Sequence, residues 1–325
     1  MENVIIKGTG YKIPEKRVTN DTLLQRLNST NEFIVNRTGV ETRYHVNINE
    51  KMSDLAIPAM SKALENANLE AKDIDLLIVN TLSPDHHDPS QACLLQAALD
   101  FRHIPVFDIR AQCSGFLYGA KIAIDGIKSG SYNNVMIVCG EVLSKRADYS
   151  DAGRNLTILL GDGAGAIILG KDKSSLYGFK DIILGADGNY FKLLWTESPG
   201  TSNATFHEGN PFFRMTGHDM FEHATKTLAN CVIQILHQNN LNLEDIDLII
   251  PHQPNLRILE SVGELLEVNK EKIYINVTDY GNIASASLPI AIAMAKEQKL
   301  MQENHKYIFL AYGSGATWGA ALYQN

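Results

Sequence analysis

Short, mostly apolar runs recur along the chain and predict buried strands. A run of roughly four to eight such residues is too short for an ordinary helix and is typical of a strand covered on both faces. The runs are Ile74–Val79, Val106–Ile109, Val135–Cys139, Ala166–Leu169, Ile246–Ile250 and Ile308–Ala311. A further strand is expected at Ile273–Val277.

Helical patterns separate these runs. From Met52 to Ala67, apolar residues recur at helical spacing and form one stripe. A second stripe contains Phe221, Ala224, Leu228, Cys231 and Ile235. Strands that alternate with helices are typical of α/β proteins. The pattern therefore predicts mainly parallel sheets covered by helices.

Two segments of the chain recur in the same order roughly half the chain later. The sequence of Asp73–Val79 is closely matched by Asp245–Pro251, and Gly161–Ala166 is echoed by Gly313–Trp318. Internal similarity of this kind is typical of a duplicated fold. We therefore expect two related α/β halves, residues 1–172 and 173–325.

Length and charge agree with an ordinary folded protein of this kind. The chain has 325 residues, more than one ordinary core requires, and its hydrophobic fraction of 45% excludes a disordered chain. It contains 29 Lys and Arg against 37 Asp and Glu, a formal net charge of −8. Nucleic-acid binders usually carry a basic excess, so we expect no nucleic-acid partner.

Membrane and secretion signals are missing from the pattern. No uninterrupted run of about 18 apolar residues occurs, so no membrane insertion is expected. Residues Met1–Val4 lack the basic and apolar regions of a secretion signal. The four cysteines are scattered without Cys-x-x-Cys pairs, which favours a reducing compartment and argues against a zinc ribbon. We expect a cytoplasmic protein.

Cys113 is a candidate nucleophile, because it lies where the strand Val106–Ile109 is followed by a helix. Unpaired amides and the dipole at a helix N-terminus favour a thiolate, and Gly115 allows a ligand or backbone to approach closely. The apolar stripe of that helix is Phe116, Ala120, Ala123 and Ile127. On position alone, a buried structural cysteine remains the alternative, and we expect that role for Cys93, Cys139 and Cys231.

His252 is the histidine best placed for chemistry. It directly follows the strand Ile246–Ile250 and lies between Pro251 and Pro254. Ligands of open α/β sheets bind beyond the carboxyl ends of strands. His218 and His223 are poorly spaced for a shared metal site, and loop or surface positions are expected for His86, His87, His207, His237 and His305.

Asn282 opens a second helix rich in small residues. In the duplicated arrangement it occupies nearly the same repeat position as Cys113, so the two would face each other with His252 beside them. A cysteine, a histidine and a carboxamide together suit acyl transfer. The thiolate attacks a thioester carbonyl, and the other two groups stabilise the developing oxyanion.

Over essentially its whole length, the chain resembles the thiolase-fold condensing enzymes of the β-ketoacyl-acyl carrier protein synthase III type. Any one of the matching motifs would be modest evidence, but the ordered series is highly specific. It comprises Gly8–Tyr11, Arg37–Glu41, Ala111–Phe116, Gly161–Ala166, Pro251–Arg257, Gly281–Asn282 and Thr317–Gly319.

The resemblance implies a five-layer αβαβα sandwich, usually a homodimer, and no bound cofactor or metal. It implies that Cys113 is acylated by a CoA or carrier-protein thioester. His252 and Asn282 would hold the thioester carbonyl of a malonyl extender, whose decarboxylation gives an enolate that attacks the acyl group. The amides of Cys113 and Gly315 would form the oxyanion hole. The partners implied are acyl-CoA, a malonyl thioester and acyl carrier protein.

The same resemblance suggests where substrate binds. Phe33, Arg37 and Arg154 fall where family members hold the CoA nucleotide, and Arg257 lies near the pantetheine entrance. Phe33 replaces a tryptophan common in the family, and Asp88 replaces an aromatic residue that helps shape the acyl pocket. A buried carboxylate beside an alkyl chain is costly, so Asp88 is either solvated, paired, or in contact with a polar substrate group.

Several functional alternatives remain open at this point. The first is a decarboxylating condensing enzyme, in fatty acid initiation or in a specialised polyketide or lipid pathway with a longer or functionalised acyl donor. The second keeps acyl-Cys113 but transfers the acyl group to oxygen or nitrogen. The third is a papain-like hydrolase, which the sequence around Cys113 disfavours. The fourth is a non-catalytic binding module.

Overall fold

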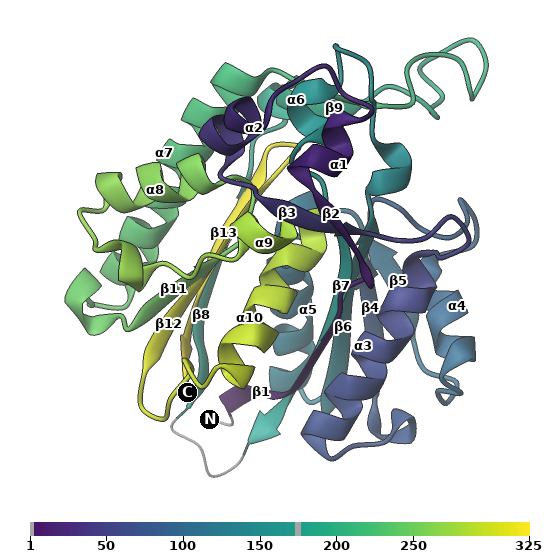
Figure 1. Cartoon of the computed structure of the whole chain (residues 1–325). Coiled ribbons are helices and arrows are strands. Elements are labelled where there is room, and N and C mark those ends of the chain that lie inside the picture. Colours follow the sequence, from purple (N-terminus) through teal and green to yellow (C-terminus); the bar gives the residue numbers. More distant parts are fainter. Residues whose placement is uncertain (1–2, 173–176) are drawn as a thin grey trace.

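Two β-sheets stack against each other in the computed structural model, with helices outside and between them (Figure 1). The structure describes residues 3–172 and 177–325. The first sheet has the order β1-β7-β6-β4-β5, and the second has the order β11-β12-β13-β8. The strands of the first sheet are β1 (Asn3–Lys12), β4 (Leu76–Asn80), β5 (Val106–Ile109), β6 (Asn134–Val142) and β7 (Asp162–Asp172). Those of the second are β8 (Gly178–Ala186), β11 (Leu248–Pro251), β12 (Lys306–Gly313) and β13 (Thr317–Gln324).

Three helical layers complete a five-layer αβαβα sandwich. One outer layer contains α3 (Met52–Ala67) and α4 (Gln91–Ala98), which cover the first sheet. The middle layer contains α5 (Gly115–Lys128) and α10 (Ser287–Glu297), which pack between the sheets. The other outer layer contains α7 (Gly217–Gln238) and α8 (Leu256–Leu265).

The remaining elements lie in the connections. Small sheets are formed by β2 (Lys16–Thr19) with β3 (Thr42–His45), and by β9 (Leu194–Thr196) with β10 (Phe213–Met215). Short α-helices are α1 (Asn20–Leu24), α2 (Asn31–Thr38), α6 (Arg154–Thr157) and α9 (Val277–Tyr280). The 3-10 turns are η1 (Ala71–Asp73), η2 (Gln112–Ser114), η3 (Ser144–Arg146), η4 (Gly188–Leu193), η5 (Leu243–Asp245), η6 (Lys270–Lys272) and η7 (Ala284–Ala286).

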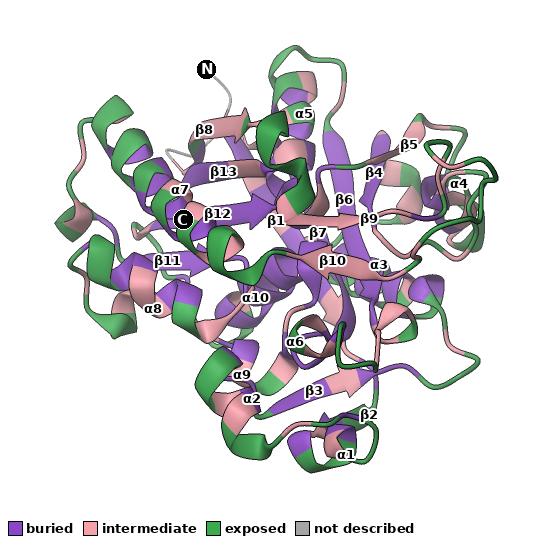
Figure 2. Ribbon diagram, turned by 90° about the horizontal axis from the view of Figure 1, so that it is seen from above, coloured by how far each residue is buried: buried purple, intermediate pink, exposed green. Residues whose placement is uncertain are grey.

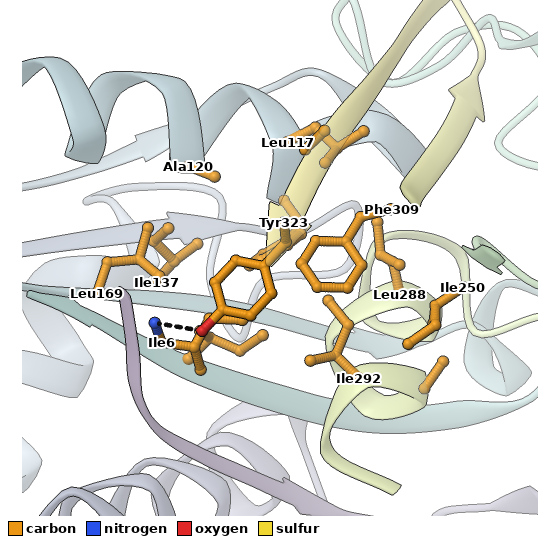
Figure 3. Close-up of a cluster of buried hydrophobic side chains, with 14 of the residues drawn as sticks. Ile6, Leu117, Ala120, Ile137, Leu169, Ile250, Leu288, Ile292, Phe309 and Tyr323 are labelled. Carbon is orange, nitrogen blue, oxygen red and sulfur yellow. Dashed lines mark hydrogen bonds between the residues drawn. The ribbon is translucent and has the colours of Figure 1, made fainter. Parts of the chain in front are cut away.

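The main core lies between the two sheets, around the middle helices. Figure 3 shows Tyr323 and Phe309 of the second sheet among aliphatic side chains from both sheets and both middle helices. The Tyr323 hydroxyl accepts a hydrogen bond from the Ile6 amide at 3.3 Å, which joins the two sheets. Each aliphatic side chain buried here contributes roughly 1.5–3 kcal/mol. In Figure 2 the strands β4, β6 and β12 are almost entirely buried, whereas β5 and β8 are largely of intermediate burial and α7 exposes its outer face.

Close approach of α3 to β1 depends on small residues. A Cβ at Gly8 would lie 2.1 Å from the Ala63 carbonyl oxygen, and one at Gly10 would lie 2.2 Å from that of Ala59. Any larger residue would push the helix away from the sheet. The apolar stripe predicted for Met52–Ala67 therefore meets a strand with no side chain at these two positions.

Two expectations about the sheets are wrong. The sheets are mixed rather than mainly parallel, because β6 pairs with β7 and β12 pairs with β13 in antiparallel fashion. The expected strand Ile273–Val277 is reduced to a single parallel bridge between Ile273 and Ile249, and helix α9 begins at Val277. The hydrogen bonds that Gln253 makes with Tyr274, Asn276 and Val277 hold this segment instead.

The two sheets resemble each other in detail. In each, a parallel pair, β4–β6 or β11–β12, is followed by one antiparallel neighbour and then by a second. The strands β4 and β11 each follow a 3-10 turn with a capping box, at Glu70 and Asn242. This correspondence supports a duplication, with the division at 172/173 as our proposal. Residues 173–176, and Met1 and Glu2 of the segment considered for a secretion signal, lie outside the described residues.

Candidate active site

Cys113 lies in a sharp turn after β5. Gln112 adopts φ of 51°, a left-handed conformation, and the Asn80 side chain stabilises it. Asn80 accepts from the Ala111 amide at 3.2 Å and donates to the Gln112 carbonyl at 3.1 Å. A Cβ at Gly115 would lie only 2.2 Å from the Asn80 side chain. Gly115, two residues after Cys113, is therefore required because the Asn80 carboxamide that stabilises the turn occupies the space of a side chain.

The environment of the Cys113 thiol differs from the expected one. The helix α5 begins two residues later, at Gly115, and Cys113 is buried. Burial, and to a smaller extent the Glu141 carboxyl, raise the pKa of the thiol to about 12, against a lowering effect of the residue's own amide. The expected thiolate is therefore wrong for the free protein at neutral pH, because loss of solvent outweighs the helix terminus.

His252 emerges from the end of β11, as expected. Its amide donates to the Leu310 carbonyl of β12 at 2.7 Å, and the ring is buried. Burial lowers the pKa of the imidazole to about 3, so the ring is neutral at physiological pH. Nδ1 has no hydrogen-bond partner among the described residues. A neutral imidazole of this kind can donate a hydrogen bond from one ring nitrogen and accept at the other.

Asn282 is fixed by hydrogen bonds at both backbone and side chain. Its amide donates to the Leu159 carbonyl at 2.7 Å, and its side-chain Oδ1 accepts from the Ala284 amide at 2.8 Å. Its Nδ2 donates to the Pro254 carbonyl at 3.2 Å. Pro254 is two residues beyond His252. The Asn282 carboxamide is therefore anchored directly to the turn that carries the histidine.

The three segments meet around the end of β12. Cys113 packs in a small apolar cluster with Ala284, which follows Asn282 by two residues. A Cβ at Gly313 would lie 2.8 Å from the Cys113 amide nitrogen. The His252 turn is joined to the same strand through Leu310. Within the described part of the chain, no hydrogen bond directly joins the side chains of the cysteine, histidine and asparagine.

The turn that contains Gly315 connects β12 to β13. Gly313, the last residue of β12, packs against the Cys113 amide. Gly315, within the turn, instead contacts Thr317. Two backbone hydrogen bonds of 2.9 Å between Asp187 and Ala316 hold the other side of the turn. The end of β12, at Gly313, therefore lies next to the Cys113 backbone and comes from the opposite half of the protein.

The four residues predicted to hold the CoA part of the substrate fall into two pairs, Phe33 with Arg154 and Arg37 with Arg257. The Arg154 guanidinium lies 5.3 Å from the centre of the Phe33 ring and donates to the Asn28 carbonyl at 2.5 Å. The Arg37 carbonyl accepts from the Asn255 side chain at 3.1 Å. Asn255 in turn caps the helix α8 that carries the fourth, Arg257. The Arg257 guanidinium lies 5.5 Å from the Phe221 ring.

Asp88 lies in an exposed loop. Its side chain is 91% exposed, and its carboxylate is 3.9 Å from the His87 ring. This placement favours the solvated alternative. The neighbouring Cys93 is exposed in α4 rather than buried, so its expected structural role is wrong. Cys139 and Cys231 are buried as expected.

The other histidines do not form a metal site. His218 pairs with Glu222 on the surface, whereas the His223 ring contacts the Tyr312 hydroxyl at 2.8 Å. Among residues 3–172 and 177–325, no group of three or more histidine, cysteine or acidic side chains is arranged to hold a metal ion. No helix in these ranges has the length and apolar character needed to cross a membrane.

Two buried polar residues near the site were not identified from the sequence. Glu141 and Ser285 are both fully buried and form a hydrogen bond of 2.5 Å. Glu141 lies near the end of β6, two residues after the apolar run Val135–Cys139. A charged residue at this place is the sequence signal from which the position could be identified. Carboxylates are rarely buried without a hydrogen-bond or ionic partner, so the burial of Glu141 indicates a structural or functional role.

Comparison with known proteins places the chain among condensing enzymes. Residues 107–188 match the family described as 3-oxoacyl-[acyl-carrier-protein (ACP)] synthase III, and residues 236–325 match its C-terminal domain family. The chain is 40% identical to the β-ketoacyl-[acyl-carrier-protein] synthase III of Helicobacter pylori, over 98% of this chain and 96% of that one. It is 38% identical to the corresponding protein of Clostridium perfringens, over 99% of both chains.

Solved structures agree with this relationship. The 3-oxoacyl-[acyl-carrier-protein] synthase III of Aquifex aeolicus superposes with a TM-score of 0.91 and 33% identity, over 100% of both chains. The priming β-ketosynthase of the R1128 polyketide pathway gives a TM-score of 0.90 and 26% identity, over 99% of this chain and 96% of that one. The αβαβα architecture described above is therefore shared with these enzymes.

Proposed function

Because this chain belongs to the 3-oxoacyl-[acyl-carrier-protein] synthase III family, we propose that it loads an acyl group onto Cys113 and condenses it with a malonyl thioester. The chain is a thiolase-fold acyltransferase of the condensing class. We assign its reaction to the initiation of fatty acid synthesis, in line with its relatives. The residue roles below are part of the proposal.

The observation that carries these roles is the meeting of three turns at the end of β12. The Cys113 turn packs on Gly313 and Ala284, and the carboxamide of Asn282 is anchored to the turn of His252. Segments from three distant parts of the sequence, each carrying one of the proposed reactive groups, thus lie next to one another. This is the arrangement that acyl transfer followed by carbonyl activation requires.

In the first half of the reaction, Cys113 takes the acyl group. The sulfur attacks the thioester carbonyl, the bond to the CoA sulfur breaks, and the thiol proton leaves with the released CoA thiol. In the described residues the Cys113 amide donates no hydrogen bond to another residue, so it is available to the developing oxyanion. The second donor comes from the turn containing Gly315, and we propose that Cys113 and Gly315 together form the oxyanion hole.

In the second half, the malonyl extender loses carbon dioxide. The thioester carbonyl accepts hydrogen bonds from the neutral His252 ring and from the Asn282 carboxamide, which stabilise the enolate oxygen. The enolate carbon then attacks the acyl carbonyl on Cys113, and the bond to sulfur breaks. The product is a β-ketoacyl thioester, and the released Cys113 thiolate takes up a proton from water to regenerate the thiol.

We further propose that Phe33, Arg37, Arg154 and Arg257 line the path of the CoA donor. Arg154 stacks against Phe33, so an adenine ring and its phosphates could meet an aromatic face and a cation at one place. Asp88 is retained only as a candidate contact for a polar acyl group. The extender is proposed to arrive on acyl carrier protein, as the names of the relatives indicate.

The Arg154→Ala variant tests the donor site. We expect the KM for acyl-CoA to rise roughly tenfold, equivalent to about 1.4 kcal/mol, with kcat changed by less than about twofold. Steady-state kinetics with varied acyl-CoA measure this. Lys121→Ala, which removes an exposed cation on α5, is the control. An unchanged KM for acyl-CoA in the Arg154 variant would show that Arg154 does not contribute to binding of the donor.

A homodimer and a cytoplasmic location are also proposed. The edge strand β5 leaves one side unpaired in its sheet and its residues are only partly buried, which would suit pairing with a second copy. All four cysteines are free, in keeping with a reducing compartment. We propose that the thioesters are the only small molecules required.

Product analysis tests the proposed reaction as a whole. Purified protein incubated with an acyl-CoA and a malonyl thioester is expected to release carbon dioxide and form the β-ketoacyl thioester in equal amounts. Radiolabelled malonyl thioester and mass spectrometry follow the two products. Acyl transfer to a hydroxyl or amine acceptor without carbon dioxide release would instead establish the acyltransferase alternative.

A further inference from the structure

Glu141 is a fully buried carboxyl group that the proposed reaction does not use. It lies near the end of β6 and accepts three hydrogen bonds. Oε1 accepts from the Ser285 hydroxyl at 2.5 Å, and Oε2 accepts from the Leu82 amide at 3.0 Å and the Ser83 hydroxyl at 2.9 Å. All its bonds are thus made within the protein, and they come from both halves of the chain.

The hydrogen bonds around Glu141 connect the turn of Cys113 to the turn of Asn282. Ser285 lies three residues after Asn282, and its hydroxyl is also 3.3 Å from the Asn80 carbonyl. The Asn80 side chain in turn stabilises the Cys113 turn through Ala111 and Gln112. Ser285 is therefore the point where the Asn282 turn meets the support of the Cys113 turn, and Glu141 holds Ser285 in place.

The charged and titratable neighbours of Glu141 are few. Arg146 of η3 is the cation that lowers its pKa, and Arg146 also donates to the Leu82 carbonyl at 2.5 Å and stacks on Phe213. The Glu141 charge also raises the pKa of the Cys113 and Cys139 thiols. Burial outweighs Arg146 and the hydrogen bonds and raises the pKa of Glu141 to about 7.

We propose that Glu141 is a positioning residue that joins the Cys113 turn to the Asn282 turn through Ser285 and Asn80, and that from this position its charge opposes ionisation of the Cys113 thiol. This inference extends the proposed function to a group outside the reacting atoms. Below about pH 7 the carboxyl is neutral and does not oppose thiolate formation. Above that pH it is charged, and the thiol becomes harder to ionise.

Labelling with iodoacetamide tests the effect of charge without any substrate. Cys113 modification is measured by peptide mass spectrometry from pH 6 to 9, with the exposed Cys93 as the internal reference in the same molecule. In the unaltered protein, the labelling rate of Cys113 should rise with pH less steeply around pH 7 than below or above it. Glu141→Gln should remove this shallow region and speed labelling several-fold above pH 8.

A labelling rate of the unaltered protein that rises tenfold per pH unit throughout this range would overturn the proposal, even if the Glu141 variant fails to fold. Equal or slower labelling of a folded Glu141→Gln protein would also overturn it. Because no thioester is used, this result does not depend on whether the protein condenses acyl groups.

Ser285→Ala tests the positioning role, because it removes one hydrogen bond and keeps the carboxylate. We expect malonyl decarboxylation to fall at least fivefold, whereas the shallow region of the Cys113 labelling profile persists and moves to higher pH, because the Ser285 hydroxyl lowers the pKa of Glu141. A loss of decarboxylation accompanied by an equal loss of Cys113 acylation would indicate a general structural role and contradict the assignment. Full decarboxylation by the variant would contradict it too.

Discussion

Cys113→Ala protein is expected to gain no mass when it is incubated with an acyl-CoA, whereas the unaltered chain gains one acyl group. The adduct requires a sulfur nucleophile, and an alanine methyl group offers none. Condensation should fall by at least about 10³-fold, because loss of a nucleophile removes the covalent route altogether. Intact-protein mass spectrometry and product formation measure the two effects.

The exposed Cys93 supplies the control for this experiment. Cys93→Ala should acylate as the unaltered protein does, because that thiol lies on α4, outside the cluster of Cys113 with Ala284. An acyl adduct on the Cys113 variant, located by peptide mapping, would show that another residue carries the acyl group. The same result would remove the basis of the proposed reaction.

Asn282→Ala should separate the two halves of the reaction. Loss of one hydrogen-bond donor to a developing oxyanion typically costs about 10²–10³-fold in rate, so malonyl decarboxylation should fall by roughly that factor. Acylation of Cys113 should change by less than about threefold, because it uses the backbone amides instead. Carbon dioxide release and the rate of adduct formation are measured on the same preparation.

Asn269→Ala is the matched control for the asparagine variant. Asn269 is exposed and caps the short turn η6, so its removal should leave both rates unchanged. Equal losses of decarboxylation and acylation in the Asn282 variant would contradict the division of roles. They would be expected instead if Asn282 served mainly to hold the loop through Leu159 and Pro254.

Much of the fold could be predicted because burial leaves a clear pattern. The strand Val106–Ile109 and the helix Met52–Ala67 have the predicted bounds, since their ends coincide with abrupt changes in polarity. Strand direction could not be predicted in this way. Both parallel and antiparallel strands are continuous apolar runs when they are covered on both faces, so the antiparallel pairing of β7 and β13 left no signal.

The predicted strand Ile273–Val277 failed for a different reason. Its alternating apolar residues are buried by contacts with α8 and β11 without forming a ladder. The side chain of Gln253 supplies hydrogen bonds that a neighbouring strand would otherwise provide. A pattern of buried residues therefore does not specify which groups form hydrogen bonds with the backbone amides and carbonyls.

The positions of the candidate site residues were easier to predict than their electrostatics. Cys113, His252 and Asn282 lie at element ends, which the sequence indicates. Their ionisation depends on how much surrounding chain excludes water, and this cannot be read from neighbouring residues. The same holds for Glu141, whose partners Ser285 and Leu82 are far away in sequence.

The contact between Gly115 and Asn80 limits how this candidate catalytic centre can be redesigned. Even a methyl group at position 115 would occupy the volume of the amide, so an engineered change there demands a smaller residue at position 80. Replacing Asn80 would remove the hydrogen bond that stabilises the left-handed conformation of Gln112. The adjacent Cys113 side chain would then no longer be held in its present orientation. Attempts to change the acyl range should therefore leave Gly115 and Asn80 unaltered and begin at residues outside this contact.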